Sequence, residues 1–178
     1  MSEPLVINHM VPWVFDKVLK EHEIWNITNG NEGQKVLLSG LDLSGMTFQR
    51  KRYKGLIFEN CNLEDCTVKK SDFSGASFID CNLDNIDVNK SCFSNVKFLN
   101  CTMKYVDINN SFLCDSTFEN CEISNLDLED SDIRGSNLSV DLVNGLKWFC
   151  AIVVSKEQLP WLYLNKNYKF YYDSISVG

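Results

Sequence analysis

The feature that most constrains the fold of this chain is a twenty-residue repeat with an internal period of five. Aligned at that interval, the middle of the chain reads FENCNLEDCTVKKSDFSGAS, FIDCNLDNIDVNKSCFSNVK, FLNCTMKYVDINNSFLCDST and FENCEISNLDLEDSDIRGSN. A bulky apolar residue returns every five positions from Leu38 to Leu138. This period matches neither the helical turn of about 3.6 residues nor the two-residue period of a flat strand. It predicts a chain that turns a corner every five residues and closes a square coil every twenty.

Two side chains in each group of five are expected to point into the core. One is the bulky residue, and the other lies two positions earlier and is mostly small or apolar. Stacked coils lie about 4.8 Å apart, so each sequence column becomes a ladder in space. Two core ladders are predicted, one of aromatic rings and one of thiols: Phe58, Phe78, Phe98 and Phe118; Cys61, Cys81, Cys101 and Cys121. The other three positions carry mostly small polar or charged residues, which suit corners and solvent.

The pattern resembles that of the pentapeptide-repeat family, whose motif is Ala/Cys-Asp/Asn-Leu/Phe-X-X. The match covers about Val36 to Leu138. The resemblance implies an all-β solenoid, a right-handed quadrilateral β-helix of about five coils at the strand spacing given above. The expected organisation is a capping helix and entry segment over residues 1–35, the repeat β-helix over 36–140, and a C-terminal cap over 141–178.

Both open ends of a solenoid need a cover, because an exposed strand edge pairs with other chains. At the N-terminus, VPWVFDKVLKEHEIW has apolar residues at helical spacing and predicts a short capping helix ending near Asn29. At the C-terminus, the residues SKEQ from Ser155 onward match a capping box and predict a second short helix within an aromatic cap. Two interpretations of that cap stay open, a cover for the last coil or a homodimer seam, and the residues proposed for both are Trp148, Phe149, Trp161 and Tyr163.

The thiol column admits a metal or redox interpretation and a packing interpretation. Zinc sites bring several thiolates to one point, usually from pairs two to four residues apart. This column is linear, and its members come from successive coils. Cysteine also packs as a small, readily buried apolar residue. The packing interpretation is therefore favoured, and neither a metal nor a cofactor is implied.

Composition and motifs narrow the class of function. The chain has 178 residues with a formal net charge of −7, which suits one domain and argues against a direct nucleic-acid binder. It shows no apolar stretch long enough to span a membrane and no signal peptide, and its eight cysteines indicate a reducing compartment, so a cytoplasmic protein is expected. No phosphate-binding loop, zinc spacing or catalytic triad is present, which predicts a protein that is not an enzyme.

Negative charge gathers toward the C-terminal coils. Asp87, Asp107 and Asp127 share one sequence column and are expected to stack as a row of charge. The full candidate face for a partner is Asp87, Asp107, Asp127, Glu129, Asp130 and Asp132. Two interpretations stay open: a surface that only keeps the rod soluble, or a rigid acidic face for a basic protein partner. Phe112, which stands where a polar residue is expected, marks a further exposed spot for binding.

The expected function is a non-enzymatic scaffold for protein–protein interaction. The family resemblance implies an alternative, because its bacterial quinolone-resistance members imitate duplex DNA and occupy the DNA site of type II topoisomerases. On that hypothesis the chain binds DNA gyrase or a related enzyme and modulates it or protects it from quinolones. Several family members dimerise through the C-terminal end, which would join two acidic ends. Lysines interrupt the acidic surface, however, at Lys69, Lys70, Lys90, Lys97 and Lys104.

Overall fold

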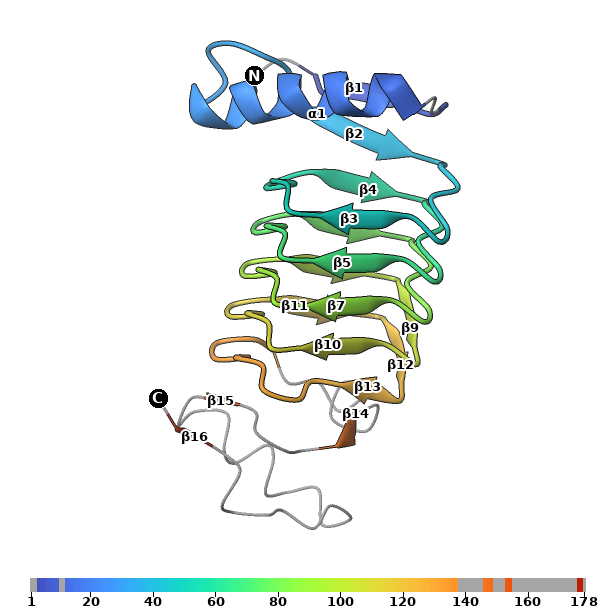
Figure 1. Cartoon of the computed structure of the whole chain (residues 1–178), viewed down its shortest axis with the longest axis vertical. Helices are drawn as coiled ribbons and strands as arrows, with labels where there is room; N and C mark the ends of the chain where they lie inside the picture. The colour runs from blue at the N-terminus through green and yellow to red at the C-terminus, as the bar shows by residue number, and fades with distance from the viewer. Residues whose placement is uncertain (1–2, 10–11, 138–145, 149–152, 155–175, 178) are drawn as a thin grey trace.

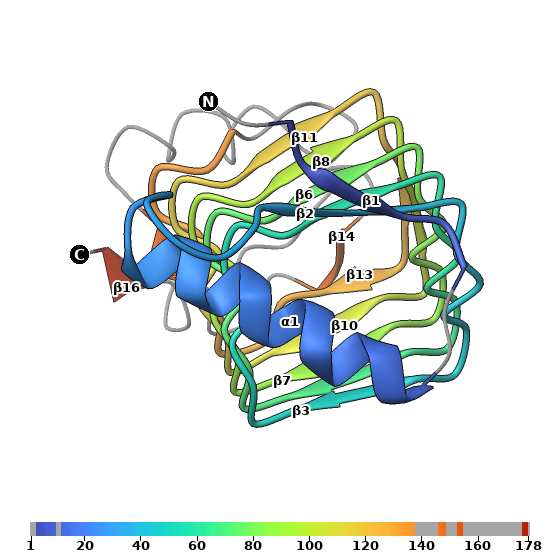
Figure 2. The same cartoon turned by 90° about the horizontal axis from the view of Figure 1, so that it is seen from above.

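The chain forms a rod of stacked square coils with a helix across its N-terminal end (Figure 1). The computed structural model describes residues 3–9, 12–137, 146–148, 153–154 and 176–177. Within this part, every strand pairing is parallel, and partners in the repeat region lie twenty residues apart, as with Phe58 and Phe78. Seen from the N-terminal end, the chain turns clockwise as it descends, so the solenoid is right-handed (Figure 2). The predicted β-helix of about five coils is confirmed.

Short strands alternate with corners along the whole repeat. The N-terminal elements are β1 (Leu5–Ile7), α1 (Pro12–Ile27) and β2 (Val36–Ser39). The strands of the first coils are β3 (Thr47–Gln49), β4 (Ile57–Glu59), β5 (Thr67–Lys69), β6 (Ser77–Ile79), β7 (Asp87–Asn89) and β8 (Lys97–Leu99). The later ones are β9 (Thr102–Lys104), β10 (Asp107–Asn109), β11 (Thr117–Glu119), β12 (Glu122–Ser124) and β13 (Leu126–Asp127). The last are β14 (Leu146–Trp148), β15 (Val153–Val154) and β16 (Ser176–Val177).

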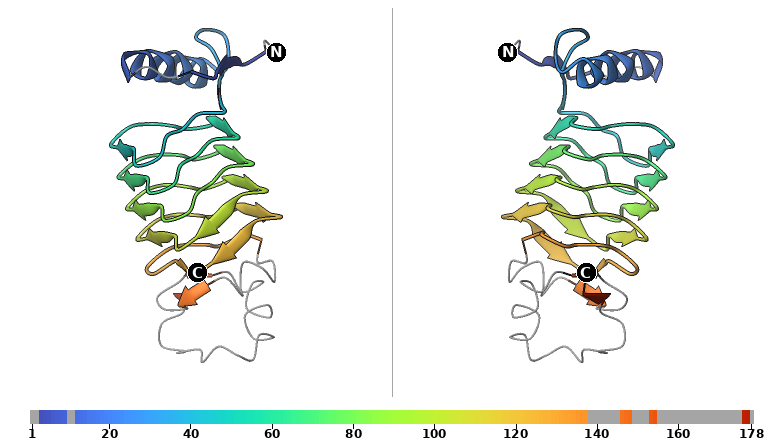
Figure 3. Two further views of the ribbon diagram at one scale, coloured as in Figure 1. Left: turned by 90° about the vertical axis from the view of Figure 1, so that its right-hand side faces the viewer. Right: turned by 90° about the vertical axis from the view of Figure 1, so that its left-hand side faces the viewer.

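The square cross-section gives the rod four faces. The first face holds the sheet β1-β2-β4-β6-β8-β11, and the third face holds β3-β5-β7-β10-β13-β14. The second face holds β9 and β12, continued upward by single bridges. The fourth face consists of bridges that join one residue per coil, in the order Arg52, Asp72, Cys92, Phe112 and Asp132. Figure 3 shows the coils from two opposite sides.

The corners are made by residues in the left-handed backbone region. Every fifth residue from Gly40 to Gly135 has a positive φ, for example 53° at Asn60 and 54° at Asn100. Glycine, asparagine and aspartate reach this region most easily, because other side chains clash with the following carbonyl oxygen. These three residue types occupy nearly all the corners. The exceptions are Arg50, Lys70, Lys90 and Tyr105.

Aromatic rings fill the centre of the rod. The rings of Phe58, Phe78, Phe98 and Phe118 stack in a line with centroid separations of 4.8, 5.3 and 4.9 Å. A second stack, Tyr53, Phe73 and Phe93, runs beside it at 4.6 and 5.0 Å. These separations equal the spacing of parallel strands, so backbone pairing and ring stacking are satisfied together.

Small inward residues complete the core through hydrogen bonds to the coil above. The thiol of Cys101 donates to the carbonyl oxygen of Phe78 at 3.3 Å. At an equivalent position, the hydroxyl of Ser116 donates to the carbonyl oxygen of Phe93 at 2.7 Å. Cysteine and serine therefore have the same role: both side chains are small enough for the core, and both donate a hydrogen bond to a backbone carbonyl of the coil above.

Helix α1 covers the first coil (Figures 1 and 2). Phe15, Val18 and Leu19 are buried against the coil, and the ring of Phe15 meets the ring of Phe48 edge-on at 6.3 Å. The predicted N-terminal helix is thus confirmed. Strand β1, which was not predicted, pairs with the upper edge of β2 and extends the first face by one strand.

At the C-terminal end, β14 pairs with β13 and continues the third face. The predicted C-terminal helix at Ser155 lies outside the described residues. Within the described ranges, no helix has both the length and the apolar character needed to cross a membrane.

Candidate interaction surface

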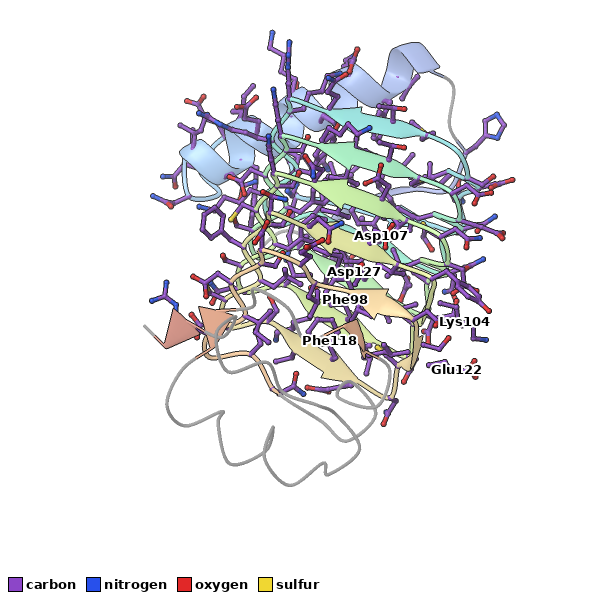
Figure 4. The ribbon with its side chains drawn as sticks, turned by 60° about the horizontal axis from the view of Figure 1, so that its bottom comes forward. Phe98, Lys104, Asp107, Phe118, Glu122 and Asp127 are labelled. Atoms are coloured by element: carbon purple, nitrogen blue, oxygen red, sulfur yellow. The ribbon has the colours of Figure 1, made fainter. Side chains whose placement is uncertain are left out.

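The predicted column of aspartates lies on the third face. Asp87 in β7, Asp107 in β10 and Asp127 in β13 are direct partners in one parallel ladder. The side chains of Asp87 and Asp107 are exposed, and that of Asp127 is partly exposed. Figure 4 shows Asp107 and Asp127 on neighbouring strands of this face. The backbone pairing places the three residues one above another at the coil spacing of about 4.8 Å.

Two further acids extend this column in the last coil. Glu129 follows β13, and its backbone N–H donates to Oδ1 of Asp127 at 3.1 Å. Asp130 occupies the next corner with a φ of 56°, and both side chains are exposed. We call Asp107, Asp127, Glu129 and Asp130 the acidic patch. The described strands place these four carboxylates at the lower end of the third face.

Asp132, also predicted for this face, lies elsewhere. It belongs to the fourth face, it is only 8% exposed, and Arg134 donates to it from Nε at 2.9 Å and from Nη2 at 2.6 Å. Burial acts to raise the pKa of Asp132, but the hydrogen bonds from Arg134 outweigh it and hold the pKa below the usual value. The structure therefore does not bring Asp132 together with the acidic patch, and its visible role is structural.

The sign of charge changes along the third face. In the upper coils Lys69 lies 3.7 Å from Asp87, which offsets the first charge of the column. On the second face, Lys104 pairs with Glu122 at 2.8 Å (Figure 4). The corner between the third and fourth faces carries Arg50, Lys70 and Lys90 in three successive coils. On the third face, negative charge is thus concentrated in the last two coils, and the upper coils carry positive charge at the corner with the fourth face.

The thiol column lies in the core. Cys61, Cys81, Cys101 and Cys121 are buried with free thiols. Hydrogen bonding to the thiol of Cys101, followed by burial, raises the pKa of Cys121, and hydrogen bonds to both neighbouring thiols raise that of Cys81. Among the described residues, no group of three or more His, Cys, Asp or Glu side chains is placed to hold a metal ion. The four thiols of the column are buried in the core and pack the rod.

The predicted residues of the C-terminal seam are only partly placed. Trp148 ends β14, where its backbone pairs with that of Asp127. Phe149, Trp161 and Tyr163 lie outside the described residues. The dimer seam therefore stays a prediction.

Sequence reasoning missed one surface. It treated Lys70 and Lys90 as interruptions of the acidic surface, whereas they form a row of their own with Arg50. The available signal was the residue type, because long cationic side chains stand at a corner where Gly, Asn or Asp is the rule.

The geometry defines a class of protein, the right-handed parallel β-solenoid with a square cross-section and a filled core. A family model for the pentapeptide repeat region matches residues 52–128. Residues 52–128 therefore form a pentapeptide repeat region within this solenoid. No curated protein matches the chain.

Several solved structures are similar. A pentapeptide repeat protein from the thylakoid lumen of Arabidopsis thaliana is 20% identical, with 59% of this chain and 70% of that chain covered and a TM-score of 0.47. A pentapeptide repeat protein from the cyanobacterium Cyanothece 51142 is 11% identical, with 71% and 97% covered and a TM-score of 0.48. Trypsin-treated QnrB1, a plasmid-mediated fluoroquinolone resistance protein, is 12% identical, with 77% and 99% covered and a TM-score of 0.36. The coil geometry itself defines the fold of this chain.

Proposed function

We propose that this protein is a non-enzymatic scaffold whose acidic patch binds a basic surface of a protein partner. The observation that carries the proposal is the ladder that aligns Asp107 with Asp127, with Glu129 and Asp130 beside them. Like charges directly opposite on neighbouring strands repel. The ladder holds these like charges in register, so the acidic patch presents concentrated negative charge to a cationic surface.

The rigidity of the coils supports the same proposal. The N–H of Asp107 donates to the carbonyl of Ile86 at 3.0 Å, and the N–H of Asp127 donates to that of Val106 at 2.8 Å. The carboxylates are therefore attached to a backbone that is fixed before any partner arrives. Fixed charges of one sign steer an oppositely charged partner and set its orientation with little loss of entropy on binding.

A DNA mimic is the second candidate. The observation that favours it is the single file of carboxylates, about 4.8 Å apart, because a DNA strand carries one phosphate for each rise of about 3.4 Å. DNA gyrase or another type II topoisomerase would be the target, with modulation of the enzyme or its protection from quinolones as the effect. The patch spans only the last coils, so it would replace a short stretch of duplex.

One set of variants tests both candidates. The patch variant combines Asp107→Asn, Asp127→Asn and Asp130→Asn and so removes three negative charges. The fold should be kept, because an amide oxygen at position 127 can still accept the hydrogen bond from Glu129 and asparagine suits the corner at position 130. The control combines Glu32→Gln, Asp65→Asn and Asp80→Asn, which removes equal charge from other exposed positions. Proteins captured by the natural chain and the control but lost with the patch variant would support the scaffold.

The DNA-mimic hypothesis predicts a more specific effect, on one enzyme. In a DNA gyrase supercoiling assay, run with and without a fluoroquinolone at two salt concentrations, the protein inhibits the enzyme or protects it from the drug. The effect fades as salt rises, because exposed charges are screened. It is also lost in the patch variant and kept in the control. If the protein has no effect at concentrations well above that of gyrase, mimicry toward this enzyme is excluded while the scaffold proposal stands.

A further inference from the structure

A second charged surface lies at the corner between the third and fourth faces. Arg50, Lys70 and Lys90 occupy the same corner in three successive coils, and we call them the basic row. We propose that the basic row, together with the exposed ring of Phe112, binds a short acidic peptide segment of another protein. This site lies apart from the acidic patch, carries the opposite charge and does not depend on the function proposed above.

The first argument is backbone conformation. Arg50, Lys70 and Lys90 have φ values of 53°, 52° and 53°. A side chain other than that of asparagine or aspartate is disfavoured in this region, and such residues persist where the surroundings or a function require them. Tyr105 is the other non-Gly, non-Asn, non-Asp residue among the corners, whereas the basic row takes three consecutive places at one corner. Its composition therefore runs against the local preference three times in succession.

The second argument is electrostatic. Backbone N–H groups of Arg50 and Lys70 donate to carbonyls one coil below, at 3.0 and 3.1 Å, so the row follows the coil spacing of about 4.8 Å. Among the described ion pairs, Lys51 contacts Asp16 and Arg52 contacts Glu23 on helix α1, while no ion pair involves a residue of the basic row. Three stacked cations repel one another, and an anion bound along the row would relieve that repulsion.

The third argument is the shape of the surface beside the row. A shallow, open depression lies at this corner, and its lining includes the whole basic row, Cys92 and Phe112. Phe112 stands one coil below Cys92 on the fourth face and exposes 56% of its surface. Asp72 also lines the depression, and its carboxylate accepts a hydrogen bond from the backbone N–H of Ser74 at 2.9 Å. The depression thus offers positive charge from the basic row and an apolar contact from Phe112 at its lower end.

These features favour an acidic peptide over a nucleic acid. The row spans about 10 Å, which is the length of about three residues of extended chain. A longer polyanion that continued down the same corner would meet Asp130 and the rest of the acidic patch. A peptide segment of about three residues ends before it reaches the acidic patch, so the patch does not repel it. An apolar side chain at the end of the segment can contact Phe112.

The probe is a fluorescein-labelled peptide of consecutive glutamates with a phenylalanine at each end, and binding is followed by fluorescence anisotropy. In the variant Arg50→Asn, Lys70→Asn and Lys90→Asn, asparagine preserves the corners, and affinity is expected to fall about tenfold or more. The control Lys17→Gln, Lys97→Gln and Lys104→Gln removes equal charge from other exposed positions and leaves the affinity within about twofold. Phe112→Ser weakens the probe but not a matched peptide with glycine at both ends.

Three outcomes overturn the proposal. Equal affinity of the basic-row variant and the control would mean that the row does not bind the peptide. Tighter binding of a single-stranded DNA of the same charge would identify a nucleic-acid site. Self-association in sedimentation experiments that vanishes in the basic-row variant would identify the acidic patch of a second copy as the occupant. Thermal unfolding of each variant establishes that a loss of binding is not a loss of the fold.

Discussion

The Nδ1 atom of His22 accepts a hydrogen bond from the backbone N–H of Val36 at 3.0 Å. Its Nε2 atom lies 2.9 Å from the carbonyl oxygen of Lys54, so the neutral ring with its proton on Nε2 joins helix α1 to β2 and to the first coil. The ring is only 1% exposed. One buried imidazole therefore binds two backbone groups and holds the helix on the solenoid.

This arrangement makes the stability of the cap depend on pH. Burial lowers the pKa of His22 from the usual 6.5, and nearby Lys35 acts in the same direction, against the opposing hydrogen bond with Lys54. The unfolded chain binds the proton first as pH falls. The contribution of His22 to stability is therefore complete above pH 6.5 and is lost progressively as pH falls from there toward the lowered pKa.

Urea unfolding at a series of pH values between neutral and mildly acidic measures this dependence. The variant His22→Gln carries no titratable group at this position, so its stability is expected to vary less with pH than that of the natural chain. His9→Gln is the matched control and keeps the dependence. A natural chain and a His22→Gln variant with parallel pH profiles would contradict the assignment.

Phe78 and Phe112 give a matched test of the core. Phe78 is 1% exposed between Phe58 and Phe98, whereas the ring of Phe112 points outward. Phe78→Ala opens a cavity in a narrow core and is expected to cost about 3–5 kcal/mol of unfolding free energy. Phe112→Ala is expected to change it by no more than about 0.5 kcal/mol. Both values come from urea unfolding, and similar costs for the two changes would be inconsistent with the stacked core.

Under native conditions, the rate at which each thiol reacts with a disulfide reagent should depend on how deeply that thiol is buried. Cys92 and Cys114 are partly exposed on the fourth face, while the thiol column is buried. In a Cys150→Ser background, we expect Cys92 and Cys114 to react first and the four column thiols only on unfolding. The order can be read by mass spectrometry of the labelled peptides. Early labelling of Cys81 or Cys101 would show that the core opens to solvent.

The main architecture could be predicted from sequence because its period is unusual. Phe58 and Phe78 have to face the same way when a corner recurs every five residues, and the aromatic ladder follows from that geometry alone. Strand β1 could not be predicted in this way, since the three residues Leu5–Ile7 carry no period. It is placed only by its pairing with β2.

The candidate surface was predictable in part, for a related reason. Shared columns aligned Asp107 and Asp127 correctly, because a column is a direct consequence of the period. The pairing of Asp132 with Arg134 was missed, because it depends on how two side chains two residues apart meet on the fourth face. The basic row was missed for a different reason: its meaning lies in the positive φ of its corner, which a count of charges along the chain does not reveal.

At the corner occupied by Lys70, we expect the residue that is best for peptide binding to be unfavourable for the stability of the fold. Lys70→Asn replaces a disfavoured residue in the left-handed region and removes one of three stacked charges, so it is expected to stabilise the fold by about 0.5–1 kcal/mol. The reciprocal change Asn100→Lys, at a corner with a φ of 54°, is expected to destabilise it by a similar amount and also removes the hydrogen bond from Asn100 to Asp80.

Lys69→Asn is the control for the corner effect, because residue 69 belongs to β5 and its backbone is not among the positive-φ positions. Urea unfolding of the three variants at low and high salt separates the two causes, since salt screens the repulsion between charges but does not change the backbone preference. A Lys70→Asn variant that is less stable than the natural chain at both salt concentrations would show that Lys70 stabilises its corner. In that case the basic row would need no ligand to explain it. If Lys70→Asn is more stable but binds the acidic peptide more weakly, the chain keeps lysine at this corner, at a cost in stability, because its positive charge contributes to peptide binding.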